Sequence, residues 1–217
     1  MPEYRQFRFV RPPDATEIVL LRHGETIAER PDRPFSLLEG QADPGLSPEG
    51  REQAERAASR LAGTEIAAIY VTTLRRTAET AAPLAAKLGL VPAVEPDLRE
   101  VFLGEWEGVF RRKLIERDPM ALRMLEEERW DVIPGAESNE AFAGRLSRGM
   151  ERIAAAHVGE RVVAVTHGGA IGILLSLATG SRPFAFVGVD NASLSTLVVT
   201  PERWLVRSFN DVAHLMT

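Results

Sequence analysis

The chain has 217 residues, no cysteine and a formal net charge of -5 at pH 7, and this length fits one α/β domain with a proper core. The lack of cysteine excludes disulfides, thiolate metal sites and a cysteine nucleophile. The acidic balance lacks the basic excess that general nucleic-acid binding requires. We find no signal-peptide pattern and no stretch of membrane-spanning length, so we expect a cytoplasmic protein without nucleic-acid or membrane partners.

The first predicted strand, Glu17–Arg22, follows an extended N-terminal arm over residues 1–16. Its continuous apolar run is typical of a strand that is buried on both faces of a parallel sheet. His23 comes directly after this strand, and His167 comes directly after a second such run, Val162–Thr166. Ligands bind at the carboxyl ends of parallel strands, so we expect the two histidines to emerge at one edge and approach each other.

A long polar loop separates His23 from Ser47, and loops of this length are usually functional or mobile. Ser47 is the predicted N-cap of a helix that has Pro48 at its first position and ends at Gly63. The next predicted elements are a strand over 66–71, a helix over 74–88 that Pro83 kinks or divides, a short strand over 90–94 and a loop over 98–108.

The second half of the chain predicts a lid followed by more of the main domain. Two short charged helices, over 111–116 and 119–130, indicate a lid within residues 109–137. The remaining predicted elements are a helix from Ser138 to about His157, the strand 162–166, a helix over 168–178 and hairpin strands over 193–200 and 204–209. The pattern predicts one α/β domain over 17–217, with a mainly parallel central sheet, helices on both faces and a small helical lid insertion.

The residue types at these strand ends favour phosphoryl transfer. A neutral imidazole can attack a phosphoryl group whose oxygens guanidinium groups hold, and histidine can form the covalent intermediate itself. Glycine after each histidine lets an anion approach the main chain, and a helix start supplies N–H donors. Arg22, Arg76 and His167 can offset the charge on the transferring group, while a carboxyl group must protonate the leaving alkoxide.

Four separated motifs resemble those of the histidine phosphatase superfamily, the group that also holds the cofactor-dependent phosphoglycerate mutases. The motifs are Leu21–Thr26, Tyr70–Ala81, Leu98–Gly108 and Thr166–Gly169. The resemblance spans about residue 17 to the C-terminus and implies a phosphoglycerate mutase-like fold. It implies a metal-independent phosphatase that needs no cofactor and hydrolyses a small phosphorylated metabolite.

The resemblance also gives each motif a catalytic role. It implies that His23 is the nucleophile and forms a phosphohistidine intermediate. Arg22 and Arg76 then hold the phosphoryl oxygens, Glu100 donates the proton, and His167 is the second histidine of the site.

The chain departs from the family pattern at a phosphate-binding asparagine, because Glu29 occupies the nearest position. Gln41 or Ser36 is the neutral donor that could substitute, and we expect Gln41 and Gly168 to contact the substrate. The run Arg111–Lys113 is interpreted as a charged helix face, with a substrate-anchoring patch as the alternative. Such a patch would favour an anionic substrate.

Three further functions stay open at this point. A phosphoglycerate mutase would return the phosphoryl group to another hydroxyl, but the chain is short for a mutase and lacks their basic insertion. A catalytically weak phospho-ligand-binding protein is the second alternative. A metal hydrolase built on His23, His167 and a carboxylate is disfavoured, because the neighbouring arginine would repel a divalent cation. The sequence leaves open whether the protein is a monomer or a homodimer.

Overall fold

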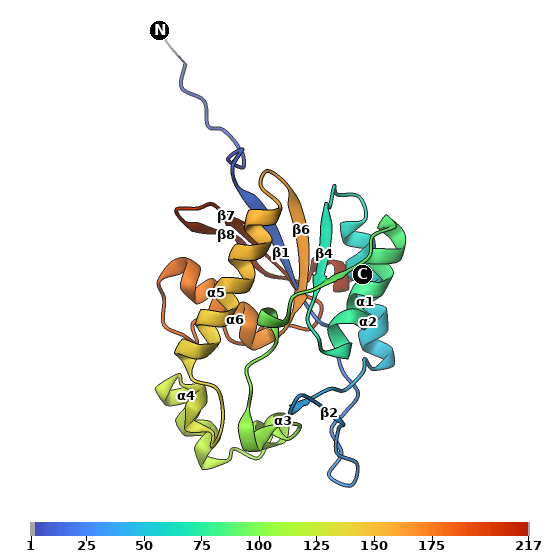
Figure 1. Cartoon of the computed structure of the whole chain (residues 1–217), viewed down its shortest axis with the longest axis vertical. Helices are drawn as coiled ribbons and strands as arrows, with labels where there is room; N and C mark the ends of the chain where they lie inside the picture. Colours follow the sequence, from blue (N-terminus) through green and yellow to red (C-terminus); the bar gives the residue numbers. More distant parts are fainter. Residues whose placement is uncertain (1–2, 217) are drawn as a thin grey trace.

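A six-stranded sheet forms the centre of the computed structural model, which describes residues 3–216. The strand order is β5-β4-β6-β1-β7-β8 (Figure 1). The first four strands in this order are parallel, whereas β7 and β8 add an antiparallel edge. The strands are β1 (Thr16–Arg22), β4 (Ala68–Val71), β5 (Ala93–Val94), β6 (Arg161–Thr166), β7 (Leu194–Val199) and β8 (Trp204–Asp211). The predicted mainly parallel sheet is therefore confirmed.

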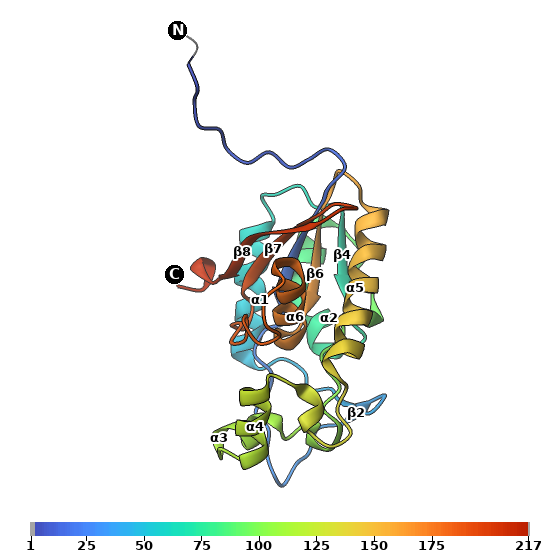
Figure 2. The same cartoon turned by 90° about the vertical axis from the view of Figure 1, so that its left-hand side faces the viewer.

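Helices cover both faces of the sheet, as the sequence predicts (Figures 1 and 2). One pair packs on each face, and the contacts of their buried side chains define two hydrophobic clusters. The pairs are α1 (Pro48–Leu61) with α2 (Arg75–Leu88), and α5 (Asn139–Ala156) with α6 (Gly168–Thr179).

The side chains of β1 alternate between these two clusters. Ile18 and Leu20 lie in the cluster with α5 and α6, whereas Val19 and Leu21 lie in the cluster with α1 and α2. All four are buried, because successive side chains of a strand point to opposite faces and helices cover both faces here. The apolar run of β1 is continuous because the side chains on both faces of this strand are buried.

A cap covers the carboxyl ends of the parallel strands (Figure 1). It consists of a small hairpin and a helical segment that is inserted between β5 and α5. Its elements are β2 (Leu37–Leu38), β3 (Gln41–Ala42), α3 (Phe110–Ile115) and α4 (Pro119–Glu127). Both histidines of interest follow strands that end beneath this cap.

Most predicted boundaries agree with the structure, and two predictions do not. The Ser47 side chain caps α1 by accepting from the Gly50 amide, and Ser138 caps α5 in the same way. The hairpin β2–β3 lies within the predicted loop, because two-residue strands carry no readable alternation. The helix α2 runs undivided through Pro83, since Leu84 and other buried side chains on the same helix hold it against the sheet.

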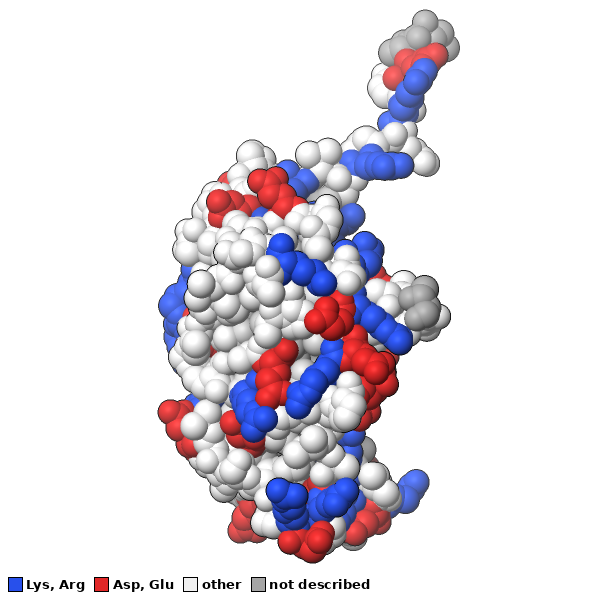
Figure 3. All heavy atoms as spheres, turned by 90° about the vertical axis from the view of Figure 1, so that its right-hand side faces the viewer, with Lys and Arg blue, Asp and Glu red and all other residues white. Residues whose placement is uncertain are grey.

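The segment before β1 forms an extended arm that leaves the domain at the end opposite the cap (Figures 1 and 2). The Arg11 guanidinium donates to the Gly159 carbonyl where the arm meets the domain. On the face seen in Figure 3, acidic and basic side chains are interspersed. Within residues 3–216, no helix is both long enough and apolar enough to cross a membrane.

Candidate active site

His23 and His167 lie side by side at the carboxyl edge of the sheet. Their ring centroids are 5.2 Å apart and their planes are inclined by 62°. Both side chains are buried. They meet because β1 and β6 are neighbouring parallel strands whose last residues, Arg22 and Thr166, are paired in register.

Three segments hold the backbone of His23 in place. Its amide donates to the Thr166 carbonyl at 2.9 Å. Its own carbonyl accepts from the Asn191 side-chain amide at 3.0 Å and from the Ala192 amide at 3.3 Å. The next amide in the chain, that of Gly24, donates to the Thr80 hydroxyl at 3.0 Å. The position of the His23 ring is thus fixed by β6, by the loop before β7 and by α2.

The His23 imidazole has the form that a nucleophile requires. Its Nδ1 lies 2.8 Å from the Gly24 carbonyl oxygen, so Nδ1 carries the hydrogen and Nε2 keeps its lone pair. Burial, reinforced by the positive charges of Arg76 and Arg22, holds the pKa of His23 well below its ordinary value. The ring is therefore neutral near pH 7.

His167 presents to the same strand edge a buried ring nitrogen that has no partner among the described residues. Its Nε2 lies 3.1 Å from the Thr72 hydroxyl, and a hydroxyl that donates to Nε2 leaves the ring hydrogen on Nδ1. Within residues 3–216, neither this Nδ1 nor the buried Nε of Arg22 has a hydrogen-bond partner. Buried polar groups are almost always hydrogen-bonded, so unpartnered donors at one strand edge favour an anion site.

Two arginines complete the positive lining. Arg22 donates to the Val189 carbonyl, and the buried Arg76 donates from Nη1 to the Ala42 carbonyl at 2.9 Å. Burial lowers the pKa of both guanidinium groups, and the charge of Glu100 opposes that effect at each. The neighbouring Arg75 is exposed and pairs with a glutamate on the surface of α2, so Arg76 is the arginine of this motif that the fold turns inward.

Glu100 lies against the first turn of α6, next to His167. Its Oε2 accepts from the Gly169 amide at 3.1 Å, and its Oε1 accepts from the amides of Ala170 and Val101 at 3.1 Å each. A Cβ at position 169 would be 2.6 Å from Oε1, so glycine here leaves room for the carboxyl group in this position. The structure thus brings Glu100 together with the two histidines and the two arginines.

The two predicted substrate-binding residues lie at the edge of this group. Gly168 is the first residue of α6, and a Cβ there would lie 3.3 Å from Nε of Arg22, so glycine leaves room for that guanidinium. Gln41 is buried, and its side-chain amide donates to the carbonyls of Glu100 at 2.9 Å and Val101 at 3.4 Å. The donor group of Gln41 therefore supports the backbone of the segment that carries Glu100.

Two supporting residues were missed by the sequence analysis. The Arg145 guanidinium donates to the carbonyls of Asp97, Arg99 and Glu100 at 2.7–2.8 Å. It also forms a bidentate ion pair with the Glu137 carboxylate. The Glu107 carboxylate accepts from the Leu103 amide at 2.8 Å and from the Ala42 amide at 2.9 Å.

Burial raises the pKa of Glu107, against the opposing effect of those two amides. Glu107 lies within the motif Leu98–Gly108, but the motif assigns it no role, and Arg145 lies in none of the four motifs. Each binds backbone groups that a side-chain motif does not reveal. A charged side chain of this kind becomes recognisable only when the distant backbone groups that it contacts are known.

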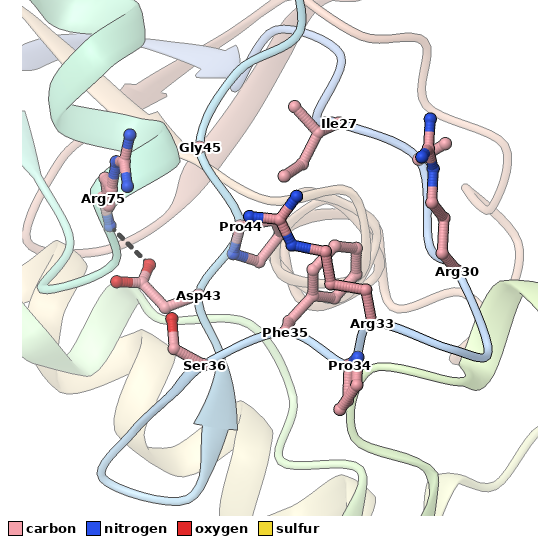
Figure 4. A pocket seen from close by; sticks show the side chains of 11 residues that line it. Ile27, Arg30, Arg33, Pro34, Phe35, Ser36, Asp43, Pro44, Gly45 and Arg75 are labelled. Atoms are coloured by element: carbon pink, nitrogen blue, oxygen red, sulfur yellow. Dashed lines mark hydrogen bonds between the residues drawn. The ribbon is translucent and has the colours of Figure 1, made fainter.

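Two cavities flank the loop that begins after the first histidine motif. One, of about 510 Å³, contains Ser36 together with Arg30, Arg33 and Arg75, whose amide donates to Asp43 at 2.8 Å (Figure 4). The other, of about 590 Å³, lies between Glu25–Glu29 and α3. Ser36, the alternative neutral donor, thus faces the first cavity and is absent from the group around His23.

The buried guanidinium groups, and the polar atoms of this group that lack a partner within residues 3–216, favour a site for an anionic group. The family model described as histidine phosphatase superfamily (branch 1) matches residues 18–212. The chain therefore belongs to the histidine phosphatase superfamily. Among the described residues, no three or more His, Asp or Glu side chains are grouped so that they could hold a metal ion.

Relatives in this superfamily include phosphatases and mutase-like proteins. The chain is 36% identical over 211 residues to phosphoglycerate mutase-like protein 4 of Arabidopsis thaliana, covering 93% of this chain and 88% of the relative. It is 34% identical over 207 residues to a metal-independent phosphoserine phosphatase of the same plant, covering 93% and 84%. The structure of a mycobacterial glucosyl-3-phosphoglycerate phosphatase superposes with a TM-score of 0.76 at 31% identity, covering 90% of this chain and 99% of that one.

Proposed function

We propose that this protein is a metal-independent phosphatase that hydrolyses a small phosphomonoester through a phosphohistidine intermediate on His23. The observation that supports this most strongly is the buried pair of imidazoles, 5.2 Å apart, flanked by the guanidinium groups of Arg22 and Arg76. Relatives named as phosphatases of phosphoserine and of glucosyl-3-phosphoglycerate support hydrolysis of a small phosphorylated metabolite.

In the first step, Nε2 of His23 attacks the phosphorus atom and the bond to the ester oxygen breaks. Burial keeps this ring neutral, so its lone pair is available without prior loss of a proton. Arg22, Arg76 and Nδ1–H of His167 hold the phosphoryl oxygens, where negative charge must be offset in the transition state. Glu100 transfers a proton to the departing alkoxide, which leaves as an alcohol.

In the second step, a water molecule attacks the phosphohistidine and the bond between phosphorus and nitrogen breaks. Glu100, now a carboxylate, accepts a proton from this water. Inorganic phosphate leaves and His23 returns to its neutral form. If a second substrate hydroxyl replaced the water, the same intermediate would give mutase chemistry, which makes phosphoglycerate isomerisation the alternative that must be measured.

The test follows phosphate release from a panel of phosphorylated metabolites, with and without a chelator, for wild type and His23→Ala. We expect release by wild type to be insensitive to the chelator and to fall by at least about 10³-fold in the variant. A short quench with radiolabelled substrate should trap an acid-labile phosphoenzyme in wild type alone.

Three outcomes would contradict the proposal. The first is isomerisation of phosphoglycerate that is faster than phosphate release, which would establish a mutase. The second is tight binding of one phosphorylated compound together with negligible turnover of every phosphate ester, including that compound, as expected of a phospho-ligand-binding protein. The third is activity in His23→Ala comparable to that of wild type.

The role of Glu100 has its own readout in the dependence on the leaving group. Glu100→Gln should slow hydrolysis of alkyl phosphates much more than hydrolysis of p-nitrophenyl phosphate, because a nitrophenolate leaves without needing a proton. Equal slowing of both esters would remove Glu100 from this role.

A further inference from the structure

The cavity between the loop that follows His23 and α3 is lined in part by the end of the first histidine motif. Its wall begins at Glu25 and Thr26, only two residues after His23, and continues across the loop to Arg111 and Arg112 on α3. Apolar side chains, among them Ile27, supply much of the remaining lining. The volume of about 590 Å³ is in the range that accommodates a small organic ligand.

The three consecutive cations of α3 have different environments. Nε of Arg112 pairs with Glu29 at 3.3 Å, and Nζ of Lys113 pairs with Asp118 at 2.8 Å. Within residues 3–216, no carboxylate forms an ion pair with Arg111. The charge of Arg111 nevertheless reaches the catalytic centre, since it helps to lower the pKa of both His23 and Arg22. Arg111 is thus a cation of the cavity that remains available to a ligand.

In the part of the chain that the structure describes, the acidic side chains that line the same cavity form no ion pair with Arg111. Glu25 accepts from the Ser47 hydroxyl at 3.0 Å, which directs this carboxylate towards α1. Glu29 is engaged by Arg112. Glu116, which also lines the cavity, is exposed and lies just beyond the end of α3. An anionic group that enters from the side of His23 therefore meets Arg111 without a competing carboxylate bonded to it.

We propose that Arg111 binds a carboxylate carried by the alcohol part of the substrate, so that the enzyme selects phosphomonoesters with a second anionic group. This inference rests on the proposed function, because it assumes that the phosphoryl group lies at His23. The alcohol part then extends into the neighbouring cavity, where apolar side chains contact its carbon skeleton. A guanidinium group matches a carboxylate with two parallel hydrogen bonds, which makes this the class of second group that Arg111 recognises best.

In this proposal, the first residue of the run Arg111–Lys113 has the role of the alternative interpretation, a substrate-anchoring patch. Glu29 also acquires a role: it occupies the place of the family asparagine and neutralises Arg112, so that one free guanidinium remains in the cavity.

The test compares esters that share a shape and differ in charge. The probes are 4-carboxyphenyl phosphate, its neutral counterpart 4-carbamoylphenyl phosphate, and the cationic 4-(aminomethyl)phenyl phosphate. For wild type we expect kcat/KM for the carboxylate ester to exceed that for the carboxamide by about tenfold, which is the scale of one charge-assisted pair at a partly exposed site. The cationic ester should be the poorest of the three.

The decisive quantity is the ratio between the carboxylate and carboxamide esters in variants. Arg111→Gln should bring this ratio close to one, mainly through KM for the carboxylate ester, and Arg111→Lys should restore part of it. The matched control is Arg123→Gln, an exposed arginine on α4 that pairs with Glu127 and lies outside the cavity lining. This control should keep the ratio and both rates of wild type.

The inference is overturned if wild type hydrolyses the three esters equally, if it prefers the cationic ester, or if Arg111→Gln keeps the wild-type ratio. These outcomes differ from failure of the proposed function. In that case, wild type would release no phosphate from any of the esters, or His23→Ala would release it as wild type does.

Discussion

The Arg145 side chain holds the backbone of the segment that carries Glu100, the proposed proton donor. Its guanidinium donates to three backbone carbonyls within residues 97–100, and Glu137 pairs with it. The side chain is largely buried, and it also helps to lower the pKa of His167. The segment that carries Glu100 is therefore fixed from α5, across the sheet edge from His23.

We predict that Arg145→Lys lowers both stability and turnover. A lysine ammonium cannot reproduce the planar fork, so at least one buried carbonyl loses its donor, at a cost of about 1.5–3 kcal/mol in the free energy of unfolding. Misplacement of Glu100 should lower kcat by about 10- to 100-fold with a smaller change in KM. Urea unfolding and steady-state kinetics measure the two effects.

The matched control is Arg148→Lys, on the same helix. Arg148 is exposed, and its contact with Asp97 is long, at 3.8 Å. Its replacement by lysine should therefore change the free energy of unfolding by less than about 0.5 kcal/mol. The positioning role is refuted if Arg145→Lys has the kcat of wild type, or if both variants lose activity to the same extent.

For single residues, the sequence predicts the proposed catalytic side chains better than the side chains that hold their backbone in place. Five residues lie in motifs that predict phosphoryl transfer, and the structure brings them together: Arg22, His23, Arg76, Glu100 and His167. Arg145 and Glu107 act on backbone groups 45 and 65 positions away in the chain, and no local pattern records such contacts.

The start of α1 is joined directly to the first histidine motif. The Ser47 hydroxyl accepts from the Gly50 amide at 3.0 Å and donates to the Glu25 carboxylate at 3.0 Å. A Cβ on Gly24 would lie 2.4 Å from the Gly50 carbonyl oxygen. The helix end and the residues after His23 thus form one closely packed unit.

We therefore predict that removal of this helix cap affects catalysis as well as folding. Ser47→Ala should lower the free energy of unfolding by about 1 kcal/mol and should also reduce kcat, because the residues after His23 lose one anchor. Ser138→Ala removes the equivalent cap of α5, whose hydroxyl accepts from the Ala141 amide at 3.2 Å. It should have a similar cost in stability and leave kcat unchanged. Thermal unfolding with parallel kinetics distinguishes the two, and an equal effect on kcat would contradict the prediction.

Elements with a clear period or cap could be predicted, and those without one could not. Ser47 and Ser138 mark helix starts, and the apolar runs before His23 and His167 mark central strands. The hairpin β2–β3 is too short to show a period. For β2–β3 the sequence fails to predict an element that exists, whereas at Pro83 it predicts a kink or division of a helix that runs undivided. Tertiary packing of α2 overrides the local signal of the proline.

For the whole molecule, two neutral imidazoles in the folded state make stability depend on pH. The pKa of both His23 and His167 is held well below the ordinary histidine value, chiefly by burial. As pH falls below about 6.5, the unfolded chain binds protons that the folded protein does not. The free energy of unfolding must therefore decrease, by up to about 1.4 kcal/mol per pH unit for each imidazole.

Urea unfolding between about pH 7.5 and 5.5 measures this loss. The double variant His23→Gln/His167→Gln should show a flatter dependence over the same range, because glutamine does not titrate. An identical pH dependence in the variant and wild type would show that other groups cause the loss. The pKa of His23 in the folded protein lies well below the ordinary value. We therefore expect kcat/KM to fall only at a lower pH than the one at which stability begins to fall, because only there does His23 lose its lone pair to a proton.

The arm before β1 offers a practical consequence for handling the protein. The seven residues of β1 separate the arm from His23 by roughly 23 Å of extended backbone, and the arm leaves at the opposite end from the cap (Figure 2). A dye or surface linker attached near Phe7, which is 93% exposed, would lie at the end of the domain opposite the cap and the residues around His23 (Figure 2). Immobilised molecules should then admit substrate as freely as dissolved ones.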